Sequence, residues 1–209
     1  MAERKQPFIL YEYYHLYNRG VEKIKIFIDK QDYKHFLLLM YICNSERSIT
    51  LRDIGKKFDR GETIVEIGAY CLMPNHFHML VREKIEGGIS TYMRKLMTAY
   101  SMYFNKKYQR TGTLYENTFK SSHCDKDQYL KYLYAYIHLN PAKLVDKNWR
   151  TNRHRNIKKL ADYTFSYPYS SLYEYLGQNY IINPTNFPHY FLKPEDYKKD
   201  LFEWLNFTP

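Results

Sequence analysis

Two histidines separated by a single residue, His76 and His78, are the part of the sequence whose spacing most suggests chemistry. They lie in HFHMLVRE, residues 76–83, which is predicted to be a strand after a Pro-Asn turn signal. Alternate side chains of a strand point to the same face, so both imidazoles would share one face, about 7 Å apart at the backbone. Phe77 would point to the other face and anchor the strand in a core. Two such imidazoles can bind one cation, although surface or core histidines give the same pattern.

A second pair of residues, Tyr136 and Asn140, follows some sixty positions later, in a segment with apolar residues at helical spacing. Residues four apart on a helix are neighbours on one face, so the phenol and the amide would lie side by side. An amide oxygen can bind a metal, and a tyrosine can act as a nucleophile. Each residue also has an ordinary interpretation. Asn140 fits a helix C-cap before Pro141, and Tyr136 is one of 24 tyrosines.

Composition points to a polyanionic partner. The chain has 209 residues, a net charge of +10 and an aromatic fraction of 18%. A basic surface rich in stacking side chains suits single-stranded DNA or RNA, although the aromatics of a basic protein can simply fill its core. The three cysteines are widely spaced, without a CxxC pair, which favours a reducing, cytoplasmic setting. The sequence has neither a signal-peptide pattern nor an apolar stretch approaching membrane-spanning length, so we expect no membrane partner.

The elements that must position these residues alternate between strands and helices. Strands are predicted at 13–19, 63–73, 76–83 and 117–123, and helices near 31–44, 89–108 and 125–140. Asp125 is a predicted N-cap, with Gln128 in the capping-box position. Residues 45–62 are polar and predict a loop with one short helix. This order predicts an α+β fold in which helices sandwich an antiparallel sheet of about four to five strands.

The composition changes after residue 146. Residues 147–159 carry six Lys or Arg and no acidic residue, and residues 160–209 contain five of the eight prolines. We therefore expect a core over residues 1–146 and a basic, Tyr- and Pro-rich extension over 147–209 that packs on it.

The sequence resembles the single-tyrosine HUH transposases, especially the group associated with repetitive extragenic palindromes. The resemblance covers roughly residues 8–177. The motifs that carry it are YHLYNRG at 14–20, D..DY..F ending at 36, MPNHFHML at 73–80, TGTLYENTFKS at 111–121, YIHLNPAKLV at 136–145 and YPYSSLYEYLG at 167–177. The His-x-His pair is weak evidence alone, but it becomes specific when combined with Tyr-Ile-x-x-Asn-Pro.

The resemblance implies an HUH, ferredoxin-like fold and a role for each candidate residue. His76 and His78 match the histidine–hydrophobic–histidine pair that binds Mg²⁺ or Mn²⁺, and Asn140 matches a third, polar ligand. Tyr136 matches the nucleophile that attacks a DNA phosphate and leaves a 5′-phosphotyrosine and a free 3′-OH. By ligand type alone, two imidazoles suit Mn²⁺ or Zn²⁺ better than Mg²⁺. The sequence contains no P-loop, in keeping with strand transfer that needs no ATP.

Basic and polar residues near these motifs are candidates for DNA contact. Contacts with phosphates position a strand without reading its sequence, and a solvated surface is the alternative interpretation for any one of these side chains. The residues that we expect to contact DNA are Asn18, Arg19, Arg94, Lys95, Lys147, Arg150, Arg153, Arg155, Lys158 and Lys159.

These observations favour a transposase-like enzyme that cleaves single-stranded DNA and transfers strands at hairpin-flanked sites. One alternative is a domesticated relative that binds hairpin DNA or RNA without strand transfer. Another is a metal-dependent phosphodiesterase in which water, rather than tyrosine, attacks. We favour a monomer, with a homodimer as the alternative. The sequence leaves open the target DNA, the metal, and whether Tyr136 acts in its own chain's site or in a partner's.

Overall fold

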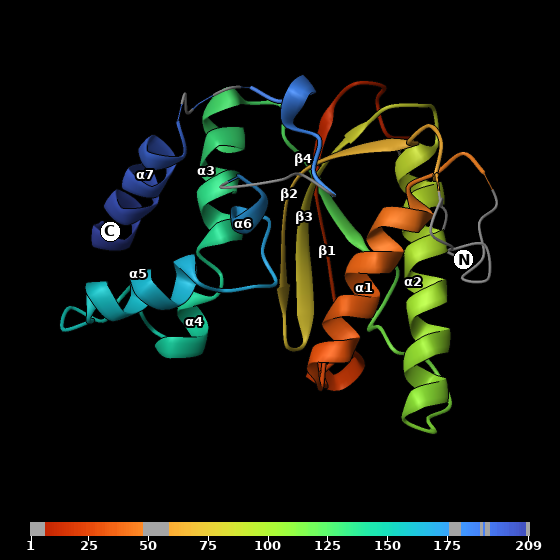
Figure 1. The fold of residues 1–209 in the computed structure, drawn as a ribbon, viewed down its shortest axis with the longest axis horizontal. Coiled ribbons are helices and arrows are strands. Elements are labelled where there is room, and N and C mark those ends of the chain that lie inside the picture. The colour runs from red at the N-terminus through yellow and green to blue at the C-terminus, as the bar shows by residue number, and fades with distance from the viewer. Residues whose placement is uncertain (1–6, 48–58, 176–180, 189, 191–192, 208–209) are drawn as a thin grey trace.

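The protein folds as a four-stranded antiparallel sheet with helices on both faces (Figure 1). The computed structural model describes residues 7–47, 59–175, 181–188, 190 and 193–207. The strands lie in the order β2-β3-β1-β4, and their bounds are β1 (Tyr13–Arg19), β2 (Val65–Met73), β3 (His76–Glu83) and β4 (Lys120–His123). The predicted α+β class is confirmed, and each predicted strand is present.

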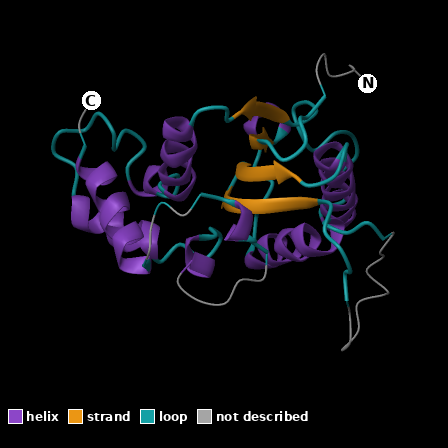
Figure 2. Ribbon diagram, turned by 90° about the horizontal axis from the view of Figure 1, so that it is seen from above, coloured by secondary structure: helices purple, strands orange, loops and turns teal. Residues whose placement is uncertain are grey.

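The helices fall into two groups. Their bounds are α1 (Lys30–Cys43), α2 (Gly88–Lys107), α3 (Asp127–His138), α4 (Ala142–Val145), α5 (Ile157–Phe165), α6 (Leu172–Tyr175) and α7 (Pro194–Asn206), with short 3-10 turns at Val21–Lys23 and Pro184–Asn186. Helices α1 and α2 cover one face of the sheet, while α3 lies against the other face with α4, α5 and α7 beyond it (Figures 1 and 2). No helix in the described ranges is long and apolar enough to cross a membrane.

The two faces of the sheet support two separate cores, as the alternation of side chains along a strand requires. On the α1–α2 side, Phe77 is fully buried and packs against Phe36, with ring centroids 5.3 Å apart. On the α3 side, Leu80 packs with Leu133 and Ile137. Phe77 therefore anchors β3 as predicted, and the side chains at 76, 78 and 80 face α3.

The histidine strand β3 is held between two neighbouring strands. Its partner β2 places Met73 opposite His76 and Cys71 opposite His78. On its other side, β1 places Tyr17 opposite His78 and Arg19 opposite His76. Hydrogen bonds on both edges fix the register of the two histidines, because a slip by one residue would turn them into the opposite core.

Helix α3 differs from the prediction at both ends. The predicted N-cap Asp125 is wrong, because the N-cap is Lys126, which makes no side-chain capping hydrogen bond. The Cys124 N–H instead donates to the Tyr13 carbonyl at 2.9 Å, which keeps the chain extended beside β1. The helix ends at His138 with Leu139 as its C-cap, so Asn140 is not the cap. The polar loop predicted at 45–62 lies mostly outside the described residues.

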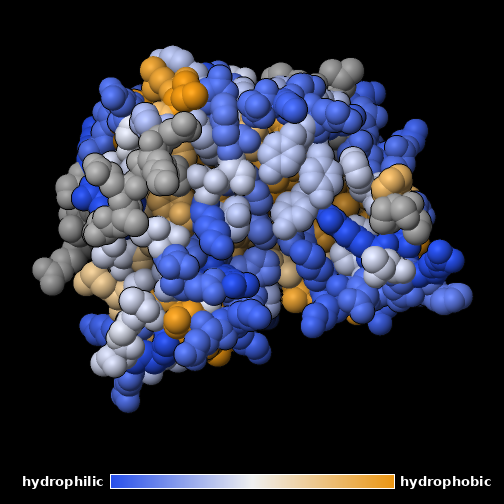
Figure 3. Space-filling view, turned by 180° about the vertical axis from the view of Figure 1, so that it is seen from behind, coloured by the Kyte–Doolittle hydropathy of each residue, from blue (hydrophilic) through white to orange (hydrophobic). Residues whose placement is uncertain are grey.

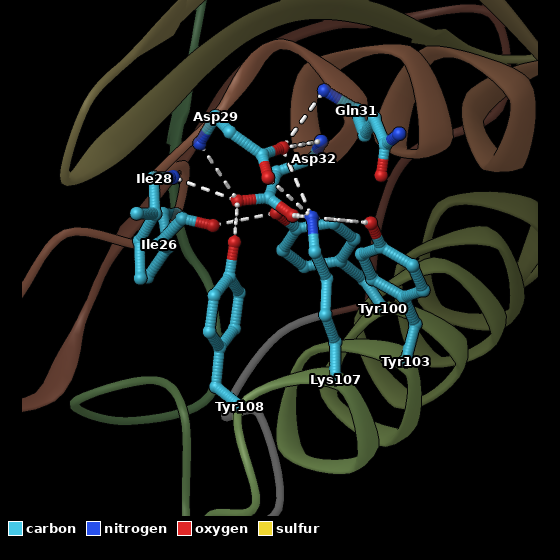
Figure 4. A network of polar contacts seen from close by, with 9 residues as sticks. All are labelled: Ile26, Ile28, Asp29, Gln31, Asp32, Tyr100, Tyr103, Lys107 and Tyr108. Atoms are coloured by element: carbon cyan, nitrogen blue, oxygen red, sulfur yellow. Dashed lines mark hydrogen bonds and ion pairs between the residues drawn. The ribbon is translucent and has the colours of Figure 1, made fainter.

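A polar network joins the start of α1 to the end of α2 (Figure 4). The buried Asp32 carboxylate accepts hydrogen bonds from Lys107 at 2.7 Å, Tyr108 at 2.8 Å and Tyr103 at 3.1 Å, and from two backbone N–H groups. Burial tends to raise the pKa of Asp32, but these donors outweigh it, so the pKa lies below its usual value. The segment D..DY..F therefore fixes the helical layer behind the histidine strand.

Replacing Asp32 with Asn is expected to lower the free energy of unfolding by about 2–3 kcal/mol at neutral pH, because it removes a buried charge that three side chains contact. Since the folded-state pKa of Asp32 is depressed, its contribution is complete above the unfolded-state pKa of about 3.9 and is lost as pH falls through the folded pKa. Urea unfolding should therefore show a constant deficit from pH 7 to about 5 that shrinks at lower pH.

Asp29 provides the matched control for this substitution. It is the N-cap of α1 and also contacts Lys107, but its side chain is 47% exposed. Asn is an equally good N-cap, and exposed ion pairs contribute little, so Asp29→Asn should lower the free energy of unfolding much less than Asp32→Asn does. Equal losses for Asp29→Asn and Asp32→Asn would contradict this account of the network.

The segment that follows residue 146 packs on the α3 side of the molecule. Leu201 and Leu205 of α7 are fully buried in the core that contains α3. Tyr197 of α7 makes a hydroxyl contact with Nδ1 of His138, the last residue of α3. The division of the chain at residue 146 stays a prediction, and its last residues, 208–209, lie outside the described range.

Candidate functional site

The two predicted imidazoles lie next to each other on the α3 side of β3. The ring centroids of His76 and His78 are 5.1 Å apart. Nδ1 of His76 lies 2.7 Å from Oδ1 of Asn75, and Nδ1 of His78 lies 2.9 Å from Nε2 of His15. An amide oxygen only accepts, so Nδ1 of His76 is the donor and its Nε2 carries the lone pair. A donor role for Nδ1 of His78 likewise leaves its Nε2 able to bind a cation.

His15 is a site residue that sequence reasoning missed. It lies on β1 opposite Leu80, diagonally adjacent to His78, and it is 6% exposed. The alternation in YYHLYN, residues 13–18, places His15 on the same face of the strand as the tyrosines at positions 13 and 17. The sequence does not give the register between β1 and β3, however, and that register is what brings His15 to His78.

The three imidazoles are held in their neutral form. Burial lowers the pKa of His15 to about 4. Burial, followed by the charges of Lys143 and Arg19, lowers the pKa of His76 to about 4. The pKa of His78 lies well below its usual value, mainly through burial. Neutral imidazole is the form that binds a metal ion, so at neutral pH no deprotonation is needed before binding.

The Tyr136 ring, on α3, contacts two of these three imidazole rings. Its ring centroid is 5.3 Å from that of His78 and 5.8 Å from that of His15, both edge-on. Nζ of Lys143 and Cζ of Arg150 each lie 5.5 Å from the centre of its ring. Burial raises the pKa of the half-buried phenol, and the Arg150 charge opposes that rise. The phenol is therefore neutral at rest, with two cations near it to offset charge that develops on its oxygen.

Both ends of the Asn140 side-chain amide already form hydrogen bonds within the protein. Asn140 is 1% exposed, and its Nδ2 donates to the Tyr136 carbonyl at 2.9 Å. Its Oδ1 accepts a hydrogen bond from Nζ of Lys143 at 3.1 Å. The predicted third ligand thus already contacts a cation, the lysine ammonium, which also lies close enough to depress the pKa of both His76 and His78.

The donor set fits a divalent metal in part. In the part of the chain that the structure describes, no group of three or more His, Cys, Asp or Glu side chains is arranged to hold an ion. The donors that could hold one are Nε2 of His76 and His78, with the Asn140 oxygen available only if Lys143 releases it. Two imidazoles with oriented Nδ1 atoms are a common half of a metal site.

A cavity of about 350 Å³ is lined by His76 and His78 and by two residues predicted to contact DNA, Asn18 and Arg19. Arg19 makes a bidentate ion pair with Glu116, at 2.5 and 2.8 Å. Asn18 is buried, and its Nδ2 donates to the Asn117 carbonyl at 3.0 Å. The structure thus brings both residues to the cavity that the histidines line, but both side chains have protein partners.

The remaining predicted DNA contacts lie in two places. Arg94 and Lys95 are on α2, across the sheet from the histidines, and Nζ of Lys95 donates to the Ser45 carbonyl at 2.7 Å. Arg150 contacts the Tyr136 ring, and Arg155 donates to carbonyls at the end of α7. Figure 3 shows that the rear face of the molecule is largely hydrophilic, with small apolar patches. The exposed members of the basic run are Lys147, Arg153, Lys158 and Lys159.

Comparison with known families gives a match. Residues 41–140 match the family model described as "Transposase IS200 like". This part of the chain, which carries β2, β3, α2, β4 and α3, is therefore similar to the IS200-like transposases.

One solved structure supports the fold, and a second gives a weaker match. The structure of a REP-associated tyrosine transposase bound to a REP hairpin is 16% identical over 86% of this chain and 88% of that chain, with a TM-score of 0.52. A crystal structure of a Deinococcus radiodurans R1 protein, provisionally described as a transposase, is 14% identical over 65% of this chain and 95% of that chain, with a TM-score of 0.39. A comparison with curated proteins gives no match.

Proposed function

We propose that this protein cleaves and transfers single-stranded DNA through a covalent 5′-phosphotyrosine on Tyr136. The observation that carries the proposal is the position of the Tyr136 ring, 5.3 Å from His78 within one chain. A nucleophile beside two neutral imidazoles suits metal-assisted phosphoryl transfer, because neutral imidazoles can hold the metal next to the attacking oxygen. The match of residues 41–140 to the IS200-like transposase family model supports DNA as the substrate.

The chemistry follows from the groups around Tyr136. The phenolic oxygen forms a bond to the phosphorus of the scissile phosphate, and the bond from phosphorus to the 3′ oxygen breaks. The phenolic proton is lost and the departing 3′ oxygen gains one, so a 3′-OH is released. Lys143 and Arg150, each 5.5 Å from the Tyr136 ring, would offset the negative charge of the phosphate during attack. A Mg²⁺ or Mn²⁺ ion held by His76 and His78 would supply Lewis acidity to that phosphate.

The substrate is proposed to carry a hairpin. The similar REP-associated tyrosine transposase was solved bound to a REP hairpin, and we extend that property to this chain as part of the proposal. The exposed lysines and arginines of residues 147–159 would contact phosphates of the folded strand and position the unpaired strand at Tyr136. We propose that the protein acts as a monomer, since Tyr136 already lies beside the histidines of its own chain.

One observation favours a second function, hairpin binding without strand transfer. The Asn140 oxygen is bound by Lys143, and the Arg19 guanidinium is paired with Glu116, so neither is free for a metal or a phosphate. A relative that only binds DNA or RNA would tolerate both contacts. Salt-sensitive hairpin binding with no cleavage under any metal would support this alternative.

The direct test is covalent trapping. A 3′-labelled hairpin with a single-stranded flank is incubated with the protein and Mn²⁺, and the products are separated on a denaturing gel, because the label must lie on the fragment whose 5′ phosphate is joined to the tyrosine. We expect a slower protein–DNA band that EDTA abolishes, and peptide mass spectrometry should place the nucleotide on Tyr136. Hydrolysed DNA without a covalent band would indicate attack by water instead.

A further inference from the structure

A second pocket, separate from the Asn18–Arg19 cavity, has Tyr136 in its lining. It has a volume of about 160 Å³, and its walls come from α3, the loop at 149–150 and the end of α7. Its lining is mostly aromatic: Tyr132, Tyr136, Trp149, Trp204 and Phe207, together with Ala135, Leu139 and Arg150. The pocket shares the Tyr136 side chain with the candidate site, so anything in it lies beside the proposed nucleophile.

The aromatic walls are arranged to receive a flat ring. The Tyr132 ring centroid lies 5.4 Å from that of Trp204 and 6.0 Å from that of Tyr136. The Trp204 ring in turn lies 6.1 Å from that of Phe207, which is 59% exposed. A cavity of about 150 Å³ lined by apolar side chains accommodates benzene, so this pocket has room for one planar ring system.

The charge at the pocket matches a nucleotide rather than a neutral apolar ligand. Cζ of Arg150 lies 5.2 Å from the Trp149 ring centroid and 5.5 Å from that of Tyr136, and Nη1 donates to the Tyr132 hydroxyl at 3.4 Å. The Arg150 guanidinium thus lies next to Tyr136 in the lining of the pocket. An aromatic platform next to a cation is how proteins bind single-stranded nucleic acid, with the base stacked and the phosphate at the charge.

The wall of the pocket at the end of α7 is held by hydrogen bonds from Arg155, which sequence reasoning did not predict. The Arg155 guanidinium donates to the carbonyls of Leu205 at 3.1 Å, Asn206 at 2.9 Å and Phe207 at 3.0 Å. These are the final carbonyls of α7 and its C-cap, which otherwise have no partner within the helix. Arg155 therefore fixes the end of α7, which carries Trp204 and Phe207. Through these two side chains the C-terminal extension forms part of the pocket.

We propose that this pocket binds one unpaired nucleobase of the strand whose phosphate lies at Tyr136. The proposal deepens the proposed function and rests on it for the identity of the strand. The base stacks against the aromatic side chains that α3 and α7 present to the pocket, and Arg150 contacts the adjoining phosphate. The extension after residue 146 then contributes to substrate binding through the end of α7.

Binding of an oligothymidine of about 16 nucleotides can be compared with that of an abasic strand of equal length and charge. The full-length protein is used in EDTA, so that no cleavage occurs, and fluorescence anisotropy gives both dissociation constants. Stacking of one base contributes about 1–3 kcal/mol, so Trp204→Ala should reduce the preference for thymidine over abasic DNA by about tenfold, and Phe207→Ala by a few fold. Affinity for the abasic strand should not change.

Phe202 provides the matched control, because it lies on the same helix, is 43% exposed and does not line the pocket. Phe202→Ala should keep the wild-type preference. The proposal is overturned if Trp204→Ala and Phe207→Ala keep that preference too, or if they weaken both strands equally. Should Trp204→Ala fail to fold, the exposed Phe207 decides. The binding assay needs no cleavage, so its result holds even if the trapping experiment gives no adduct. The trapping experiment, in turn, can succeed whatever the binding assay shows.

Discussion

Replacing Tyr136 with Phe is expected to abolish the covalent protein–DNA adduct, with a loss of at least about 10³-fold in the rate of strand cleavage. The substitution removes only the hydroxyl. The ring that contacts His78 and His15 remains, so the fold and DNA binding should be unchanged. The measurement is the initial rate of formation of the slower band in Mn²⁺, with the melting temperature and hairpin affinity of both proteins determined alongside.

The matched control is Tyr132→Phe, one helical turn earlier and with its ring 6.0 Å from that of Tyr136. This variant loses one long hydrogen bond from Arg150, at 3.4 Å, and should form the adduct within a few fold of the wild-type rate. An adduct formed by Tyr136→Phe but not by Tyr132→Phe would move the nucleophile to the neighbouring tyrosine. A mixture of Tyr136→Phe and His78→Ala proteins should stay inactive if each tyrosine serves its own chain.

Sequence reasoning predicted the strand that carries the candidate site from its alternating pattern and from the Pro-Asn turn signal before it. His76 and His78 alternate with Phe77, and the apolar side chains of that strand divide between two cores. The position of Tyr136 on a helix face followed from spacing of the same kind. Local sequence carries such information, because side-chain direction depends only on the residue number within an element.

The contacts that could not be predicted from the sequence are those between segments that lie far apart along the chain. His15 reaches His78 through the register of β1 against β3, which is set by backbone hydrogen bonds rather than by residue type. Lys143 was not selected as a site residue, yet its ammonium contacts the oxygen of Asn140. Arg155 was predicted to contact DNA, and only the packing of α7 brings its guanidinium to three carbonyls. A basic residue in a sequence therefore does not show whether its partner is DNA or protein.

The second large effect is expected at the histidine pair. Replacing His78 with Ala should lower the affinity for Mn²⁺ by more than about 100-fold and remove metal-dependent adduct formation, because one of two neutral imidazole donors is lost. Mn²⁺ binding is measured directly, from the electron paramagnetic resonance signal of the free ion, in the absence of DNA. His123, on β4 of the same sheet and exposed, is the control, and His123→Ala should bind Mn²⁺ as the wild type does.

His15→Phe separates orientation of His78 from coordination by it. A phenyl ring can keep the aromatic contact with Tyr136, but the hydrogen bond between Nε2 of residue 15 and Nδ1 of His78 is lost. Since partners of this kind fix the orientation and tautomer of a metal-binding imidazole, we expect a tenfold to 100-fold loss of Mn²⁺ affinity, about as large as outer-shell substitutions usually give. An unchanged affinity in a stably folded His15→Phe protein would show that His15 packs against His78 without orienting it. A loss in His15→Phe equal to that in His78→Ala would instead make His15 a ligand.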